Sequence, residues 1–404
     1  MFSGGDSRTD LRHGMIDALE DADPQIYKYA RHYFSALRWA VLYEEMARIV
    51  VRDALKIRST DIVSILTFPH TIDAANAIAV ECFRQGADAI LNLWTDEYYR
   101  GLLEYLSEDS LREPSKFCQA FTETVTAQVN IFGLENPDWL KKVSQSKTVA
   151  YVEGEKKAHF PRSQERKIRN ANLSLALVTK ERAKTYGFNF GAWKKAMDEA
   201  MMADLKRISE SGRTLVSDVA SGHAARLTAP NGTSLSFELA ARPVHLDDGI
   251  IDEDDIANNS LDTQFPTGSI LTTVLETSAR GKVAFDLPVQ TMGVNVADME
   301  WEFKEGKLTS ITAKKNIDPI SREMEIATGD KDRLATLEIG LNSKAKYGFM
   351  MNRIVDGAVT LGIGDNESLG GNNKTAFGTA ATISNATLEI DGRTIIKNGQ
   401  LAWQ

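Results

Sequence analysis

The sequence has few sulfur and imidazole side chains, and its second half has none. No histidine and no cysteine occurs between Leu246 and Gln404 of this 404-residue chain. Metal sites rich in nitrogen and sulfur use those two residue types, so we do not expect one in this half. The whole chain has only Cys82 and Cys118, too few for a disulfide framework. We expect two reduced thiols in a cytoplasmic protein.

Basic patches and long apolar runs are missing as well. The formal net charge is −9, whereas nucleic-acid binding favours clustered Lys and Arg on a basic domain. No window approaches 18 uncharged apolar residues, and residues 1–14 carry charges where a secretory signal would be apolar. We therefore expect neither a nucleic-acid partner nor a membrane. A chain of this length usually forms more than one core, which favours two domains.

The first half shows the alternation of an α/β domain. Residues 25–57 have the apolar spacing of a long amphipathic helix. Residues 61–68 and 89–93 are short apolar runs on either side of a helical stretch, 72–86, which ends at a glycine. A strand, helix and strand in this order predict a parallel pair, because the crossover is right-handed.

The same reading predicts a domain of residues 1–211 with further elements: a helix at 113–123, strands at 127–132 and 148–152, and a helix at 192–211. Residues 212–404 differ. They show short alternating stretches separated by Gly and Asn turns, at 234–239, 282–287, 299–303, 308–313 and 386–390. The predicted fold is an N-terminal α/β domain with a parallel sheet and a mostly antiparallel, β-rich C-terminal domain.

Local motifs for common chemistries are absent. No dinucleotide fingerprint or phosphate loop follows an N-terminal strand, and the glycine-rich tract 357–371 is interpreted as tight turns. None of Ser221, Ser234 and Ser269 occupies a Gly-x-Ser-x-Gly elbow. Residues 245–255 contain six acids in eleven residues without the spacing of a calcium-binding loop. We interpret this segment as a solvated acidic loop.

Several segments of the second half, taken in order, resemble the aminopeptidase T family of metalloaminopeptidases. The stretch 264–270 (Gln-Phe-Pro-Thr-Gly-Ser-Ile) resembles the family's Pro-x-Gly-Glu motif, and 334–342 resembles its Glu-containing Gly-x-Asn segment. Residues 360–366 and 375–380 are similar to its two histidine segments. The resemblance extends over nearly the whole chain. It implies an aminopeptidase T-like fold with a site between the domains.

The departures lie at the positions that hold two metal ions in the family, where the metals activate water and polarise a carbonyl. The resemblance places the family's two glutamates on Ser269 and Thr336, and its first histidine on Thr360. It places the tyrosine on Glu367, and the last histidine and the aspartate on Gly378 and Ala380. A shift of register could put Glu338 in the place of Thr336. No histidine follows His245, so the histidines cannot be recovered in this way.

Three functions remain open, with no cofactor expected in the first two. The preferred one is a metal-independent hydrolase of a small, aromatic or amide-type substrate. Its candidate catalytic residues are general-base carboxylates and hydroxyl donors, namely Glu338, Glu367, Asp365, Ser269, Thr336 and Thr360. The second is a non-catalytic binding protein or subunit, forming a homo-oligomer or a hetero-oligomer with an active relative. The third is an enzyme with a carboxylate-only metal site at Glu338, Asp365 and Glu367.

Overall fold

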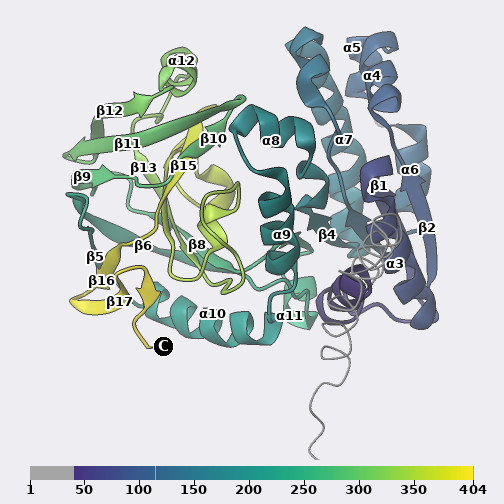
Figure 1. Ribbon diagram of the computed structural model, residues 1–404, viewed down its shortest axis with the longest axis horizontal. Coiled ribbons are helices and arrows are strands. Elements are labelled where there is room, and N and C mark those ends of the chain that lie inside the picture. Colours follow the sequence, from purple (N-terminus) through teal and green to yellow (C-terminus); the bar gives the residue numbers. More distant parts are fainter. Residues whose placement is uncertain (1–40, 114, 404) are drawn as a thin grey trace, which may run out of the picture.

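The computed structural model describes residues 41–113 and 115–403 and contains two sheets that lie side by side (Figure 1). The expected helix at 25–57 lies largely outside the described residues. Its last part is helical at 41–48 and continues as a π-helical segment, η1 (Ile49–Ala54). Within the described residues no helix is long and apolar enough to cross a membrane.

The first sheet is parallel throughout, as predicted. Its strand order is β2-β1-β3-β4-β7, with β1 Ile62–Thr67, β2 Asp88–Leu93, β3 Ala127–Asn130, β4 Arg169–Leu173 and β7 Asp262–Phe265. Helix α3 (Ile72–Arg84) makes the crossover between β1 and β2. It buries an alanine-rich face that includes Ile78 against the sheet, and the regular spacing of these residues is what made the helix predictable from the sequence.

The helices of the first half depart from prediction in three places. Residues 148–152, predicted as a strand, lie inside α7 (Gln145–Arg166), where Tyr151 packs edge-on against Tyr99. The helix predicted at 113–123 is α6 (Lys116–Thr122), which begins three residues later than predicted and is preceded by a separate short helix, α5 (Glu108–Arg112). Glu113 between them is extended, as the residue before a proline prefers.

The third departure is the helix predicted at 192–211, which is two helices, α9 (Phe190–Met201) and α10 (Leu205–Ala220). Asp204 begins α10, because its side chain accepts a hydrogen bond from the backbone N–H of Arg207. The remaining α-helices with bounds of their own are short: α4 Asp96–Tyr105, α8 Lys180–Tyr186, α11 Glu253–Ala257 and α12 Asp318–Ile326.

The second sheet has 13 strands, and all its pairings are antiparallel, as predicted. The main path is β15-β14-β13-β8-β6-β5-β16-β17-β18, and β9 to β12 branch from it. The strands are β5 Ala224–Thr228, β6 Ser234–Asp247, β8 Ser269–Val274, β9 Arg280–Ala284, β10 Val289–Thr291, β11 Val294–Lys304, β12 Lys307–Lys315, β13 Leu334–Gly340, β14 Val359–Gly364, β15 Gly378–Ile383, β16 Thr387–Ile390, β17 Arg393–Lys397 and β18 Gln400–Leu401.

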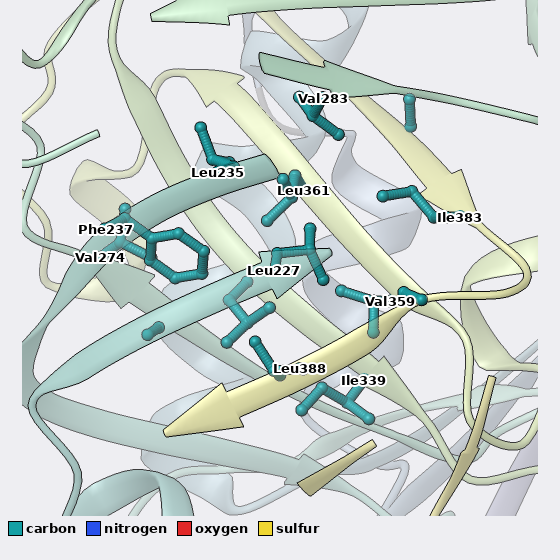
Figure 2. Packing of buried hydrophobic residues seen from close by; sticks show 14 of the residues in the cluster. Leu227, Leu235, Phe237, Val274, Val283, Ile339, Val359, Leu361, Ile383 and Leu388 are labelled. Carbon is teal, nitrogen blue, oxygen red and sulfur yellow. The ribbon is translucent and has the colours of Figure 1, made fainter. Parts of the chain in front are cut away.

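The inner face of this sheet forms an apolar core (Figure 2). Leu227, Phe237, Ile339 and Leu361 come from four different strands and are all at most 2% exposed. Burying one such side chain stabilises the fold by about 1.5–3 kcal/mol. The strands are therefore fixed in register, since a shift of one residue would turn this apolar set toward water.

The two sheets share chain segments. Strand β7, although it follows α10, joins the parallel sheet, and the buried core of the first half includes Met351, Ile354 and Ala358 from the second. Residue 212 lies within α10. The division into residues 1–211 and 212–404 stays a prediction, and the loop 341–358 lies where the two halves meet.

Candidate functional site

Strand register brings Asp247, Ser269 and Glu338 onto one face of the second sheet. Asp247 of β6 lies directly opposite Ser269 of β8, and Ser269 lies opposite Gly340, two residues after Glu338 on β13. Side chains of directly opposed and diagonal neighbours in an antiparallel sheet are close enough to interact. The Ser269 hydroxyl accordingly donates a hydrogen bond to Glu338 Oε1 at 2.8 Å.

The turn before β8 requires glycine. Gly268 has φ +117°, and a Cβ there would lie 3.1 Å from the backbone nitrogen of Asn342. Asn342 is buried, and its side-chain amide donates to the carbonyl oxygens of Thr267, at 2.8 Å, and Ala200. This contact joins the start of β8 to the loop after β13, which fixes the position of Ser269 relative to that loop.

The same loop delivers a positive charge to Glu338. Arg353, in the short helix η5 (Asn352–Ile354), donates from Nη1 to Glu338 Oε1 at 2.5 Å. The side chain of Arg353 is 44% exposed, and that of Glu338 is 9% exposed. Burial acts to lower the pKa of Arg353, but Glu338 and Asp247 outweigh it and the pKa is raised. The guanidinium therefore stays charged.

Asp247 is a second carboxyl group beside this cation. Its Oδ1 accepts hydrogen bonds from the hydroxyls of Thr263, at 3.1 Å, and Thr267, at 2.9 Å. Burial raises the pKa of Asp247 above its ordinary value, and this outweighs the two hydroxyls and the nearby charge of Arg353, which lower it. The prediction of a solvated acidic loop at 245–255 is thus wrong for Asp247, because this half-buried residue lies at the end of β6 and is held by two hydroxyl groups.

These groups line a pocket of about 260 Å³ between the two sheets. Strands β4 and β7 of the first sheet contribute to its wall together with β6, β8 and β13 of the second. One arginine faces five acids: Asp247, Asp248, Asp255, Asp262 and Glu338. The pocket therefore favours ligands with positive charge or hydrogen-bond donors, and Arg353 offers one place for an anionic or carbonyl oxygen.

The two threonines proposed from the sequence as hydroxyl donors lie outside this pocket. Thr360 lies opposite Glu338 on β14, but its hydroxyl is buried and bonded to that of Thr382 at 2.8 Å. The hydroxyl oxygen of Thr336 faces Gly362, and a Cβ on that glycine would lie 2.3 Å from it. Neither threonine lines the pocket.

The two acids after β14 lie elsewhere. Asp365 and Glu367 are exposed, and Glu367 pairs with Lys374 at 3.1 Å. Asp365 lies five residues beyond Thr360, which is opposite Glu338, and five residues of extended strand span about 17 Å. The carboxylate-only metal site at Glu338, Asp365 and Glu367 is therefore not assembled.

The donor set does not fit the two-metal centre that the resemblance implies. Among residues 41–113 and 115–403, no three His, Cys, Asp or Glu side chains are placed to hold a metal ion. Glu338, the carboxylate that a shift of register would put at a glutamate position of the family, is already neutralised by Arg353. Gly378 and Ala380 lie on β15 opposite Gly364 and Gly362, so this part of the face carries no metal-binding side chain.

Sequence reasoning missed Asp247 and Arg353. Asp247 could have been found by extending the alternation of β6 to its end and pairing it with Ser269. Arg353 has no local signal, because it lies 15 positions along the chain from its partner Glu338, beyond the end of β13.

Comparisons with solved structures define the class of fold. Wild-type AmpT from Thermus thermophilus superimposes with a TM-score of 0.66 at 15% identity, covering 89% of this chain and 99% of that one. The 2,5-dihydroxypyridine dioxygenase from Pseudomonas putida KT2440 matches with a TM-score of 0.57 at 14% identity, covering 90% and 97%. The aminopeptidase T-like fold expected from the sequence is confirmed. No curated protein matches the chain.

The family follows from the sequence itself. Residues 41–334 match the family described as Thermophilic metalloprotease (M29). The chain therefore belongs to the M29 family, and the resemblance to aminopeptidase T is confirmed. The match ends at residue 334, and Thr336, Glu338, Arg353 and Thr360 lie beyond it.

Proposed function

We propose that this M29 family member is a metal-independent hydrolase of a small amide-type substrate, with Asp247 as general base and Arg353 as the electrophile. The observation that carries the proposal is the Arg353 guanidinium bound to Glu338 in a pocket that also holds Asp247. Family membership supports a hydrolytic reaction.

Each residue has a role that follows from its contacts. A carboxyl group whose pKa is raised by burial is a better proton acceptor near neutral pH than an ordinary aspartate, so Asp247 activates the attacking water. The nitrogens of Arg353 that do not bind Glu338 polarise the substrate carbonyl and stabilise the oxyanion. Glu338 and Ser269 act as positioning residues, since their mutual hydrogen bond and the ion pair hold the guanidinium in place.

This assignment changes the roles expected from the sequence. Glu338 was proposed, with Glu367, as a general base, but its Oε1 already accepts hydrogen bonds from both Arg353 and Ser269. Asp247 forms no such ion pair with another described residue, and its side chain lines the pocket. The five acids around the pocket further support a substrate that bears an amine.

The test is hydrolysis of a panel of aminoacyl p-nitroanilides and amino-acid amides by the full chain after dialysis against EDTA. Asp247→Asn should lower kcat/KM by about 10²–10⁴-fold, which is the usual contribution of a general base. Asp298→Asn is the matched control, because Asp298 is 52% exposed on β11 and pairs only with Lys314 among the described residues. Activity in Asp247→Asn equal to that of the control would exclude this base.

The pH dependence gives a second readout. The base must be ionised, so activity is lost as pH falls through its pKa. Because burial raises the pKa of Asp247, the acid limb of kcat/KM should lie above the ordinary value of 3.8 and disappear in Asp247→Asn. Arg353→Lys should lower kcat more than it raises KM, since lysine keeps the charge but not the planar fork.

A second candidate is a non-catalytic subunit or binding protein, and one observation favours it. Glu338 and Arg353 neutralise each other, so neither charge needs a substrate or a metal ion as its partner. Such a protein would form a homo-oligomer or assemble with a relative that keeps the family's histidines. Failure of the whole substrate panel, together with co-purification of such a relative from the native source, would select this reading.

A further inference from the structure

A second pocket, of about 460 Å³, lies on the parallel sheet and is separate from the Asp247 site. Its floor is the face of β1, β2 and β3 opposite α3. Ser64 is aligned with Gln128, and Leu66 with Asn92 and Asn130, so these five side chains share one face. The alternate residues Val63 and Ile65 are fully buried on the other face. Three amides and a hydroxyl on the floor are unusual for a parallel sheet, whose strands commonly bury apolar residues on both faces.

Aromatic rings form the walls. Trp94 and Tyr98 have centroids 4.9 Å apart, and Phe117 and Phe121 stack at 5.8 Å. Phe132 and Tyr151 complete the set. The side chains of Phe117 and Tyr98 are 68% and 53% exposed, so the rings line an opening and are not packed into a closed core.

Among the residues that the structure describes, Glu155 of α7 is the only charged one that lines this pocket. No hydrogen bond or ion pair joins it to another described side chain, and burial raises its pKa. The carboxylate lies among the rings that line the pocket, and with burial, the larger cause, its charge raises the pKa values of Tyr99 and Tyr151. A desolvated carboxylate without a cation gains free energy when a positive charge enters beside it.

The thiol in the same pocket argues against a nucleophilic site. Burial, with a smaller contribution from Glu155, raises the pKa of Cys118 to about 11. The thiol is therefore protonated at neutral pH and is a poor nucleophile. We therefore interpret the pocket as a binding site and not as a site of nucleophilic catalysis.

We propose that this pocket binds a small organic cation of the substituted-ammonium class, with the aromatic rings around its alkyl groups and Glu155 beside its charge. Ring faces attract cations electrostatically, and aromatic cages recognise quaternary ammonium ions in this way. The amides of Asn92, Gln128 and Asn130 offer hydrogen bonds to a polar group on the same ligand.

The experiment compares choline with its uncharged isostere, 3,3-dimethylbutan-1-ol, on the full chain by titration calorimetry. The two probes have nearly the same shape, so the difference isolates the charge. Choline should bind at least 10-fold more tightly than the alcohol. Equal binding of the two probes, or no binding of choline at millimolar concentration, would overturn the proposal.

Variants on α6 and α7 test whether choline binds in this pocket. Glu155→Gln should weaken choline binding at least 10-fold and leave the alcohol unchanged. Glu153→Gln is the matched control, since Glu153 is 49% exposed on the same helix and pairs with Arg112 outside the pocket. Phe117→Ala should weaken both probes. Equal effects of the two glutamine variants would place the bound cation elsewhere and refute this assignment.

Discussion

The ion pair between Glu338 and Arg353 allows a quantitative test of how the site is held. Arg353→Met removes the guanidinium and leaves the Glu338 carboxylate, whose side chain is 9% exposed, with the Ser269 hydroxyl as its one remaining partner among the described side chains. Breaking a fully buried pair costs about 3–5 kcal/mol, whereas an exposed pair contributes about 0–1 kcal/mol. Because Arg353 is 44% exposed, we expect a loss of about 2 kcal/mol.

A double-mutant cycle separates this effect from lost packing. Glu338→Gln removes the charge that needs compensation, so in the double variant Arg353→Met should cost much less than it does alone. We expect a coupling free energy of about 1–2 kcal/mol from urea unfolding of the four proteins at pH 7. Additive losses, with a coupling below about 0.5 kcal/mol, would refute the reasoning that the guanidinium neutralises Glu338.

Two further predictions concern stability. The pKa of Glu276 is lowered from 4.5 to about 2, because hydrogen bonds from Arg242, Asn366 and the backbone N–H of Asn372 outweigh the effect of burial. The ionised Glu276 therefore contributes at most about 3 kcal/mol to the free energy of unfolding, and this contribution is complete above pH 4.5 and is lost as pH falls toward 2. Glu276→Gln should flatten this part of the curve of unfolding free energy against pH, and an unchanged slope would contradict the assignment. Gly340→Ala should destabilise by about 1–3 kcal/mol, because its Cβ would lie 2.1 Å from the Val355 carbonyl oxygen, whereas Gly378→Ala meets nothing closer than 3.9 Å and should be nearly neutral in thermal unfolding.

The elements that could be predicted from the sequence are those whose signal is local. The run before α3, its alanine-rich face and the glycine after it specify the parallel β1–β2 pair without distant contacts. The alternating stretches of the second half likewise correspond to antiparallel strands. The prediction of a strand at residues 148–152 was wrong because a run of valine, alanine and tyrosine has the composition of a strand. Packing of Tyr151 against Tyr99 on α4, which the sequence does not reveal, accompanies the helix there.

The site depends on contacts between distant residues, which explains why only part of it was predicted. Ser269 and Glu338 were found through the resemblance, and the structure joins them by a hydrogen bond across 69 residues. Thr336, Thr360, Asp365 and Glu367 share the same segments but lie outside the pocket. Asp247 looked like one acid among six in a polar loop, and its pairing with Ser269 on another strand is not visible in the local sequence.

The most direct test of the central claim is the kcat/KM of the EDTA-dialysed chain on its best amide substrate, measured with and without added zinc or cobalt and compared with that of Asp247→Asn. We predict equal values with and without metal for the wild-type chain and a loss of about 10²–10⁴-fold in Asp247→Asn. Loss of activity on dialysis and its recovery on adding either metal would contradict the account.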